Sequence, residues 1–94
     1  FKEYDILITP TVPFRARKIP EGKYDVELVM KQAFGMGKNL GVFDVTEHPA
    51  MNMPIAMVDG LPIGMQLVSR HWNEVIIYRA AYAWEQAYDW KKIN

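Results

Sequence analysis

The chain has 94 residues, half of them hydrophobic and 13% aromatic, so it forms at most one domain and is built to pack rather than to stay disordered. Lysine plus arginine equals aspartate plus glutamate at 11 each, and the basic residues are scattered, which argues against a nucleic acid partner. There is no cysteine, no signal peptide and no apolar run near the roughly 18 residues of a membrane span, so we expect a cytoplasmic protein without a membrane partner.

The first quarter of the sequence predicts one strand and one long loop. Residues 5–9 form a short apolar run with β-branched side chains, closed by Pro10, and this composition favours a buried strand. Residues 10–23 contain three prolines, a glycine and several basic residues, which indicate an extended surface loop.

A helix is predicted at about 25–36, followed by an unusual connection. Asp25 can cap this helix, and apolar residues at helical spacing continue until Gly35 and Gly37 weaken the pattern. Residues 39–49 then read as a loop with Gly, Asn, Asp and Pro signals, yet they include several large apolar side chains. We therefore expect this loop to be packed down or to line a site.

Residues at about 51–68 predict a β-hairpin. Asp59-Gly60 between two apolar runs is the strongest short-range hairpin signal, because a type I′ turn needs positive φ at both central residues. This turn predicts four cross-strand pairs: Val58 with Leu61, Ala56 with Ile63, Ile55 with Gly64, and Pro54 with Met65. Alternation then predicts one face of Pro54, Ala56, Ile63, Met65 and Leu67, and a second face of Met53, Ile55, Met57, Gly64 and Gln66.

Both predicted faces are largely apolar, so the hairpin needs cover on both sides, as in layered α/β proteins. A second helix is predicted at about 73–89, capped by Asn73 and with apolar residues at helical spacing. Two helices cannot cover both faces and also bury the apolar connection. We therefore expect the rest of the core to lie in further sequence or in another chain, and we take Phe1 as a boundary within a longer protein.

Few residues are candidates for chemistry. Ser69 is the only serine, next to His71, but catalytic pairs are recognised by geometry rather than by adjacency, so we interpret it as a polar residue that ends a strand. His48 is either a loop histidine bonded to backbone, or a pocket wall or general base. Two distant histidines and no carboxylate pattern make a metal site unexpected, and no motif predicts a cofactor.

Three stretches in order resemble the C-terminal end of the amidase signature family. They are the strand and turn "YDILITPTVP", the loop and hairpin "GVFDVTEHPAMNMPIAMVDGLPIGMQLV", and the closing loop and helix "SRHWNEVIIYRAAYAWEQA". The sequence of the loop is most similar to that of the enantioselective amidases that accompany nitrile hydratase. The resemblance implies that residues 1–94 are a single segment, the C-terminal part of a larger layered α/β amidase domain with a mixed sheet.

The resemblance also implies an activity, the hydrolysis of a carboxylic amide to acid and ammonia. The family's Ser, cis-Ser and Lys triad lies upstream, so no catalytic residue is expected in this chain, and the chain alone is expected to be inactive. It would supply sheet, helix and one wall of the substrate pocket, formed by Leu40, Gly41, Phe43, Asp44, Val45, Thr46 and His48. Apolar side chains in that wall would favour an apolar or aromatic acyl group.

Two positions depart from the family's pattern: Asp44 stands where Asn is frequent, and Glu47 stands where Gly is frequent. The second change removes a residue that adopts positive φ easily, which puts the path of the loop in doubt.

The expected partners are a small-molecule amide and the remainder of the amidase fold, with a homodimer left open. The alternatives are a non-catalytic binding or assembly module derived from the family, and a family member with another substrate, such as a transamidation subunit that acts on charged tRNA. The scattered basic residues count against the tRNA reading.

Overall fold

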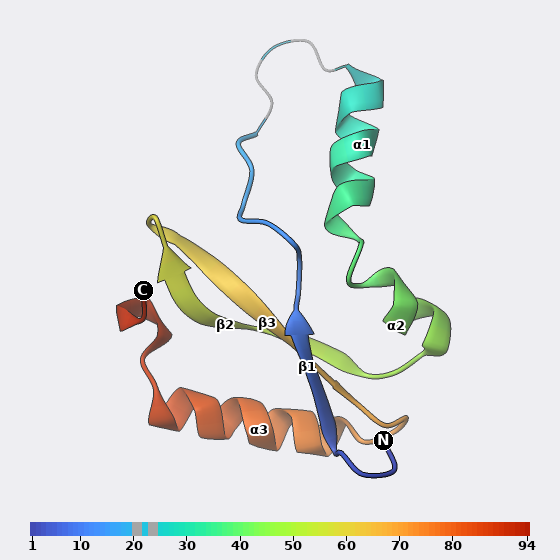
Figure 1. Cartoon of the computed structure of the whole chain (residues 1–94), viewed down its shortest axis with the longest axis vertical. Helices are drawn as coiled ribbons and strands as arrows, with labels where there is room; N and C mark the ends of the chain where they lie inside the picture. Colours follow the sequence, from blue (N-terminus) through green and yellow to red (C-terminus); the bar gives the residue numbers. More distant parts are fainter. Residues whose placement is uncertain (20–21, 23–24) are drawn as a thin grey trace.

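The computed structural model describes residues 1–19, residue 22 and residues 25–94, with the backbone only for Met36. The predicted α/β fold class is confirmed: three strands form one sheet, and helices follow the predicted order (Figure 1). The elements are β1 (Ile6–Pro10), α1 (Val26–Met36), α2 (Gly41–Thr46), β2 (Ala50–Val58), β3 (Leu61–Ser69), α3 (Glu74–Ala87) and the 3₁₀ turn η1 (Trp90–Lys92). None of the helices in these residues is both long and apolar enough to cross a bilayer.

The sheet has the order β1-β3-β2, and both pairings are antiparallel. The predicted strand, helices and hairpin are all present within two residues of their expected bounds. The mixed sheet implied by the family resemblance concerns the larger domain. Of the predicted loop at 10–23, positions 11–19 form no regular element, and positions 20, 21, 23 and 24 lie outside the described residues.

The hairpin turn forms as predicted, with φ of 50° at Asp59 and 76° at Gly60. Val58 pairs with Leu61 and Ala56 with Ile63, as expected. The other two predicted pairs are wrong, because a β-bulge between Pro54 and Ala56 shifts the register, so that Pro54 pairs with Gly64. Proline has no backbone N–H to donate to a neighbouring strand, and within sheets it is therefore tolerated at bulges such as this one.

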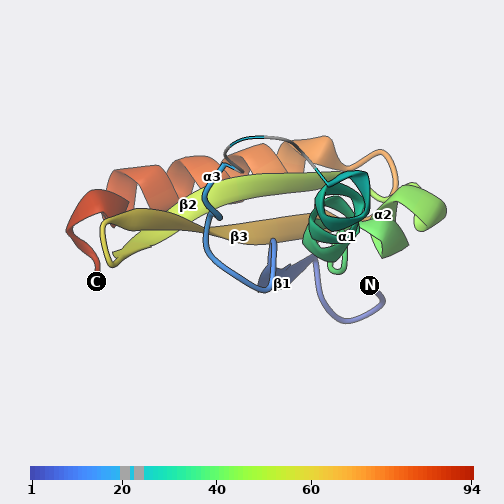
Figure 2. The same ribbon diagram turned by 90° about the horizontal axis from the view of Figure 1, so that it is seen from above.

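The same bulge corrects the predicted faces. Met53 pairs with Met65 and therefore shares its face, although alternation without a bulge assigns Met53 to the face of Gly64. Pro54 moves to the opposite face for the same reason. Met53, Leu67 and Ile77 form the buried core, so the Met53 face packs against α3, which runs along one side of the hairpin (Figure 2).

Two other expectations are corrected. Asn73 precedes α3 but its side chain makes no capping hydrogen bond; with φ −113° and ψ 48° its backbone lies outside the extended conformation of most N-caps. The loop predicted at 39–49 contains a short helix, α2, in which the Thr46 hydroxyl donates to the Val42 carbonyl at 3.0 Å. By contrast Asp25 caps α1 as predicted, accepting from the Glu27 amide at 3.0 Å.

The molecule is a thin plate of 48 × 35 × 17 Å with a radius of gyration of 15.6 Å. A compact domain of this length has a radius of gyration of about 12 Å. Much of the excess comes from α1, which projects away from the sheet (Figure 1) and leaves large apolar side chains exposed: Val26, Leu28, Val29, Met30 and Phe34. Such exposed apolar surface is normally covered by other protein.

Candidate functional site

The seven predicted wall residues lie on α2 and the turn after it, which we call the wall segment (residues 40–48). Phe43 is half-buried, whereas the side chain of Val45 is 84% exposed. Leu40 and His48 are also half-buried, and the exposed members are Gly41, Asp44, Val45 and Thr46. The predicted residues are neighbours in sequence and remain in one short segment, in which three are half-buried and four are exposed.

The wall segment is joined to the sheet at its first end through Asn39. The Asn39 side-chain amide donates to the Pro10 carbonyl at 3.0 Å, and the Asn39 carbonyl accepts from the Gln66 side chain at 3.2 Å. Gln66 is 3% exposed and also donates to the Thr9 hydroxyl at 3.1 Å. Because a buried amide needs such partners, Gln66 fixes this end of the segment to β1 and β3.

At its second end the wall segment contacts His71 through Thr46 and His48. The Nδ1 atom of His48 lies 2.8 Å from the Thr46 hydroxyl, and Nε2 of His71 lies 2.7 Å from the Thr46 carbonyl. The imidazole rings of His48 and His71 stack with centroids 4.0 Å apart, and the Phe1 ring lies 5.4 Å from that of His48. For His48 this geometry combines a side-chain hydrogen bond with aromatic packing.

Glu47 resolves the doubt about the path of the loop. It ends α2 with φ 58° and ψ 26°, the left-handed conformation that glycine adopts easily. The turn thus keeps the shape that a glycine would favour, at the energetic cost of a side chain in a sparsely populated region.

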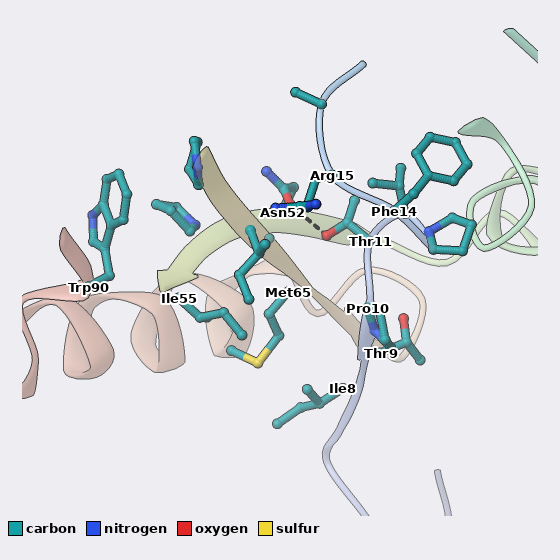
Figure 3. Close-up of a pocket in the computed structure, with 17 residues that line it drawn as sticks. Ile8, Thr9, Pro10, Thr11, Phe14, Arg15, Asn52, Ile55, Met65 and Trp90 are labelled. Carbon is teal, nitrogen blue, oxygen red and sulfur yellow. Dashed lines mark hydrogen bonds between the residues drawn. The ribbon is translucent and has the colours of Figure 1, made fainter. Parts of the chain in front are cut away.

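Sequence reasoning missed a hollow of about 1010 Å³ beside the sheet (Figure 3). Its lining comes from the end of β1, the loop after it, both hairpin strands and Trp90; the apolar members include Ile8, Phe14, Ile55 and Met65. None of the seven predicted wall residues lines it. A smaller hollow of about 550 Å³ adjoins the wall segment and is lined by Glu47, His71, Trp72 and Glu74.

The large hollow is also lined by the polar residues Thr9, Thr11, Arg15 and Asn52. The Thr11 hydroxyl donates to the Asn52 side chain at 2.5 Å, drawn as a dashed line in Figure 3. Gly64 passes beneath this pair so closely that a Cβ atom there would lie 2.3 Å from the Asn52 oxygen. The Thr-Pro-Thr turn and the glycine in β3 were the only sequence signals for this arrangement.

Ser69 is fully buried, and its hydroxyl donates to the Asn73 carbonyl at 2.9 Å. The adjacent His71 contacts Thr46 rather than Ser69. A serine in this position ends a strand and supports the turn into α3, as predicted. Across the described part of the chain, no three His, Asp or Glu side chains are placed to hold a metal ion.

Comparison with known proteins identifies the family. The family model described as "Amidase" matches residues 1–77. The chain belongs to the amidase family. It is 40% identical over 98% of its length to a glutamyl-tRNA(Gln) amidotransferase subunit of Geobacillus thermodenitrificans, and 38% identical over 99% to the corresponding amidotransferase subunit of Clostridium kluyveri.

A third relative, an uncharacterized protein in the nthA 5′ region of Rhodococcus erythropolis, is 34% identical over 90% of the chain. The chain spans 43% of the length of the Rhodococcus protein and 18% of each of the two amidotransferase subunits. Each of these relatives is therefore more than twice as long as this chain.

Proposed function

We propose that this chain is the C-terminal part of an amidase domain that hydrolyses a carboxylic amide to acid and ammonia. The observation that carries the proposal is the family match over residues 1–77, combined with the small share of its relatives that the chain spans. The chain supplies strands, α3 and the wall segment, while the nucleophile and its base lie in the remainder of the protein. Residues 1–94 are in this proposal one segment of a larger domain.

In this proposal the wall segment contacts the acyl group of the substrate. Its large side chains Leu40, Phe43 and Val45 are apolar, and small-molecule sites are mostly apolar with a few polar contacts. Asp44, Thr46 and His48 provide the polar groups, and Gly41 lets the acyl group approach the backbone. An aromatic or branched aliphatic amide is the substrate class that this composition favours.

The proposal is tested with the purified full-length protein and a panel of primary amides that runs from propanamide to benzamide. We expect release of ammonia from at least the aromatic members, and loss of that activity after treatment with a serine-reactive fluorophosphonate. A well-folded full-length protein that releases no ammonia from any amide would contradict the proposal and favour the non-catalytic binding module.

Transamidation is a second candidate, supported by the 40% identity to the glutamyl-tRNA(Gln) amidotransferase subunit of Geobacillus thermodenitrificans. Such a protein would transfer ammonia rather than release it. The balanced charge of the chain, with 11 basic and 11 acidic residues, counts against extensive contacts with the tRNA backbone, since such contacts need lysine or arginine. Ammonia release from simple amides without added tRNA favours the hydrolase, and strict dependence on charged tRNA favours transamidation.

A further inference from the structure

We propose that His71 is a positioning residue that holds the second end of the wall segment, and that its loss lets the proposed acyl-binding wall move. The inference rests on the proposed function for its effect on substrate, but the contact itself can be tested without any activity. His71 belongs to the turn between β3 and α3, so it links the wall segment to the rigid part of the sheet.

The wall segment is only partly packed. Val42 and Val45 on α2 are 56% and 84% exposed, and Leu40 and Phe43 are half-buried, so limited apolar burial holds this helix in place. A helix of six residues is also too short to be stable by itself. Its position therefore depends on its two ends, the Asn39 contacts to Gln66 and Pro10, and the contacts of Thr46 and His48 with His71.

The direction of each hydrogen bond follows from the donors available. A carbonyl only accepts, so Nε2 of His71 must carry a proton and donate to the Thr46 carbonyl. The Thr46 hydroxyl uses its single proton on the Val42 carbonyl, so it accepts from Nδ1–H of His48. His71 thus satisfies a carbonyl at the C-terminal end of α2, where no further helical turn supplies a donor.

The second contact is the ring stack. His48 and His71 lie nearly parallel, with 19° between their planes and 4.0 Å between centroids. The residues next to the two histidines, Glu47 and Trp72, have φ of 58° and 62°. Positive φ at two non-glycine residues persists only where surrounding contacts determine the conformation. The hydrogen bond and the stack together are the contacts that determine it here.

The two contacts can be separated by substitution in the full-length protein. His71→Gln keeps an amide donor near the Thr46 carbonyl and removes the ring, His71→Phe keeps the ring and removes the donor, and His71→Ala removes both. Tyr78→Phe is the control, because Tyr78 is exposed on α3 and has no part in the wall segment. The readouts are hydrogen exchange of the backbone amides in residues 41–48 and the separate values of kcat and KM for amide hydrolysis.

We expect His71→Ala to speed exchange in residues 41–48 and to raise KM about fivefold, the size expected from one hydrogen bond, with kcat changed less than about twofold. His71→Gln and His71→Phe should each give a smaller change. Unchanged exchange in His71→Ala overturns the inference whatever the activity shows. Faster exchange with an unchanged KM overturns the effect on substrate, and an inactive wild-type protein with faster exchange refutes the proposed function while leaving the contact established.

Discussion

Gly64 shows how a single missing side chain shapes the large hollow. A Cβ atom at this position would lie 2.3 Å from the Asn52 oxygen and 3.2 Å from the Thr11 hydroxyl. Gly64→Ala should therefore force this hydrogen-bonded pair apart and lower the free energy of unfolding of the full-length protein by about 1–3 kcal/mol.

Gly41→Ala is the matched control, since no atom lies within 4 Å of a Cβ built there. Denaturant unfolding of both variants measures the difference. Equal stability of the two would mean that the close approach beneath Asn52 has no energetic weight.

Glu47 carries a second residue-scale prediction. Because its φ is 58°, Glu47→Gly should leave the free energy of unfolding unchanged or raise it by up to about 1 kcal/mol, whereas Glu47→Val should lower it by about 1–3 kcal/mol. The thermal midpoints of the two variants, recorded under identical conditions, make the comparison. If Glu47→Gly is as destabilising as Glu47→Val, the left-handed backbone conformation at residue 47 does not determine stability.

Sequence reasoning at this scale succeeded where one residue acts on its neighbours and failed where the backbone decides. Asp25 caps α1 and Asp59-Gly60 makes the turn, because both depend only on adjacent residues. Asn73 is a residue type that often caps helices, but with its backbone outside the extended conformation its side chain makes no capping hydrogen bond. The Glu47 turn was doubted because its residue type is unfavourable, while the surrounding contacts of Thr46 and His48 enforce it.

At the scale of elements, α3 has one face in the core and the opposite face exposed. Ile77 is 2% exposed and packs against Met53 and Leu67, whereas the neighbouring Tyr78 is 66% exposed. Ile77→Ala should lower the free energy of unfolding by about 2–5 kcal/mol, because it removes buried contacts and leaves a cavity.

Tyr78→Ala, at the next residue, is the control and should lower the free energy of unfolding by less than about 0.5 kcal/mol. Chemical unfolding curves of the full-length variants provide the values. A large loss in Tyr78→Ala would show that the exposed face of α3 is covered in the full-length protein.

The elements themselves were largely predictable, and their faces were not. Apolar residues at helical spacing located both long helices, and the Asp59-Gly60 turn located the hairpin, because these signals depend on residues close in sequence. The bulge near Ile55 reversed the faces of Met53 and Pro54, since one inserted residue inverts every side chain beyond it. The short helix α2 gives no helical signal in the sequence, because its six residues are too few to show a period.

For the whole molecule, the exposed apolar surface is the dominant feature. Apart from the α1 residues, large side chains that are at least half exposed include Ile8, Ile19, Val45, Val75, Tyr78 and Tyr82. The isolated 94-residue chain should therefore self-associate or precipitate at micromolar concentration. Sedimentation velocity tests this, and a monodisperse monomer that melts cooperatively would contradict it.

The sequence indicates only the part of the candidate site whose residues are close together along the chain. The wall segment is contiguous, so a family resemblance over residues 40–48 could indicate it. The large hollow instead draws on β1, the loop after it, both hairpin strands and Trp90, which meet only in the folded sheet. The contact of His71 with Thr46 joins residues 25 positions apart and has no sequence signature.

The central claim, that the wall segment shapes the substrate pocket of an amidase, is tested most directly by Phe43→Ala in the full-length protein. We measure kcat/KM for benzamide and for propanamide, with Tyr78→Phe, which lies on α3 outside the wall segment, as the control. The account predicts that Phe43→Ala lowers the ratio of the benzamide value to the propanamide value by about tenfold or more, while Tyr78→Phe leaves this ratio unchanged. An unchanged ratio in Phe43→Ala, with both amides still hydrolysed, would contradict the assignment of this wall.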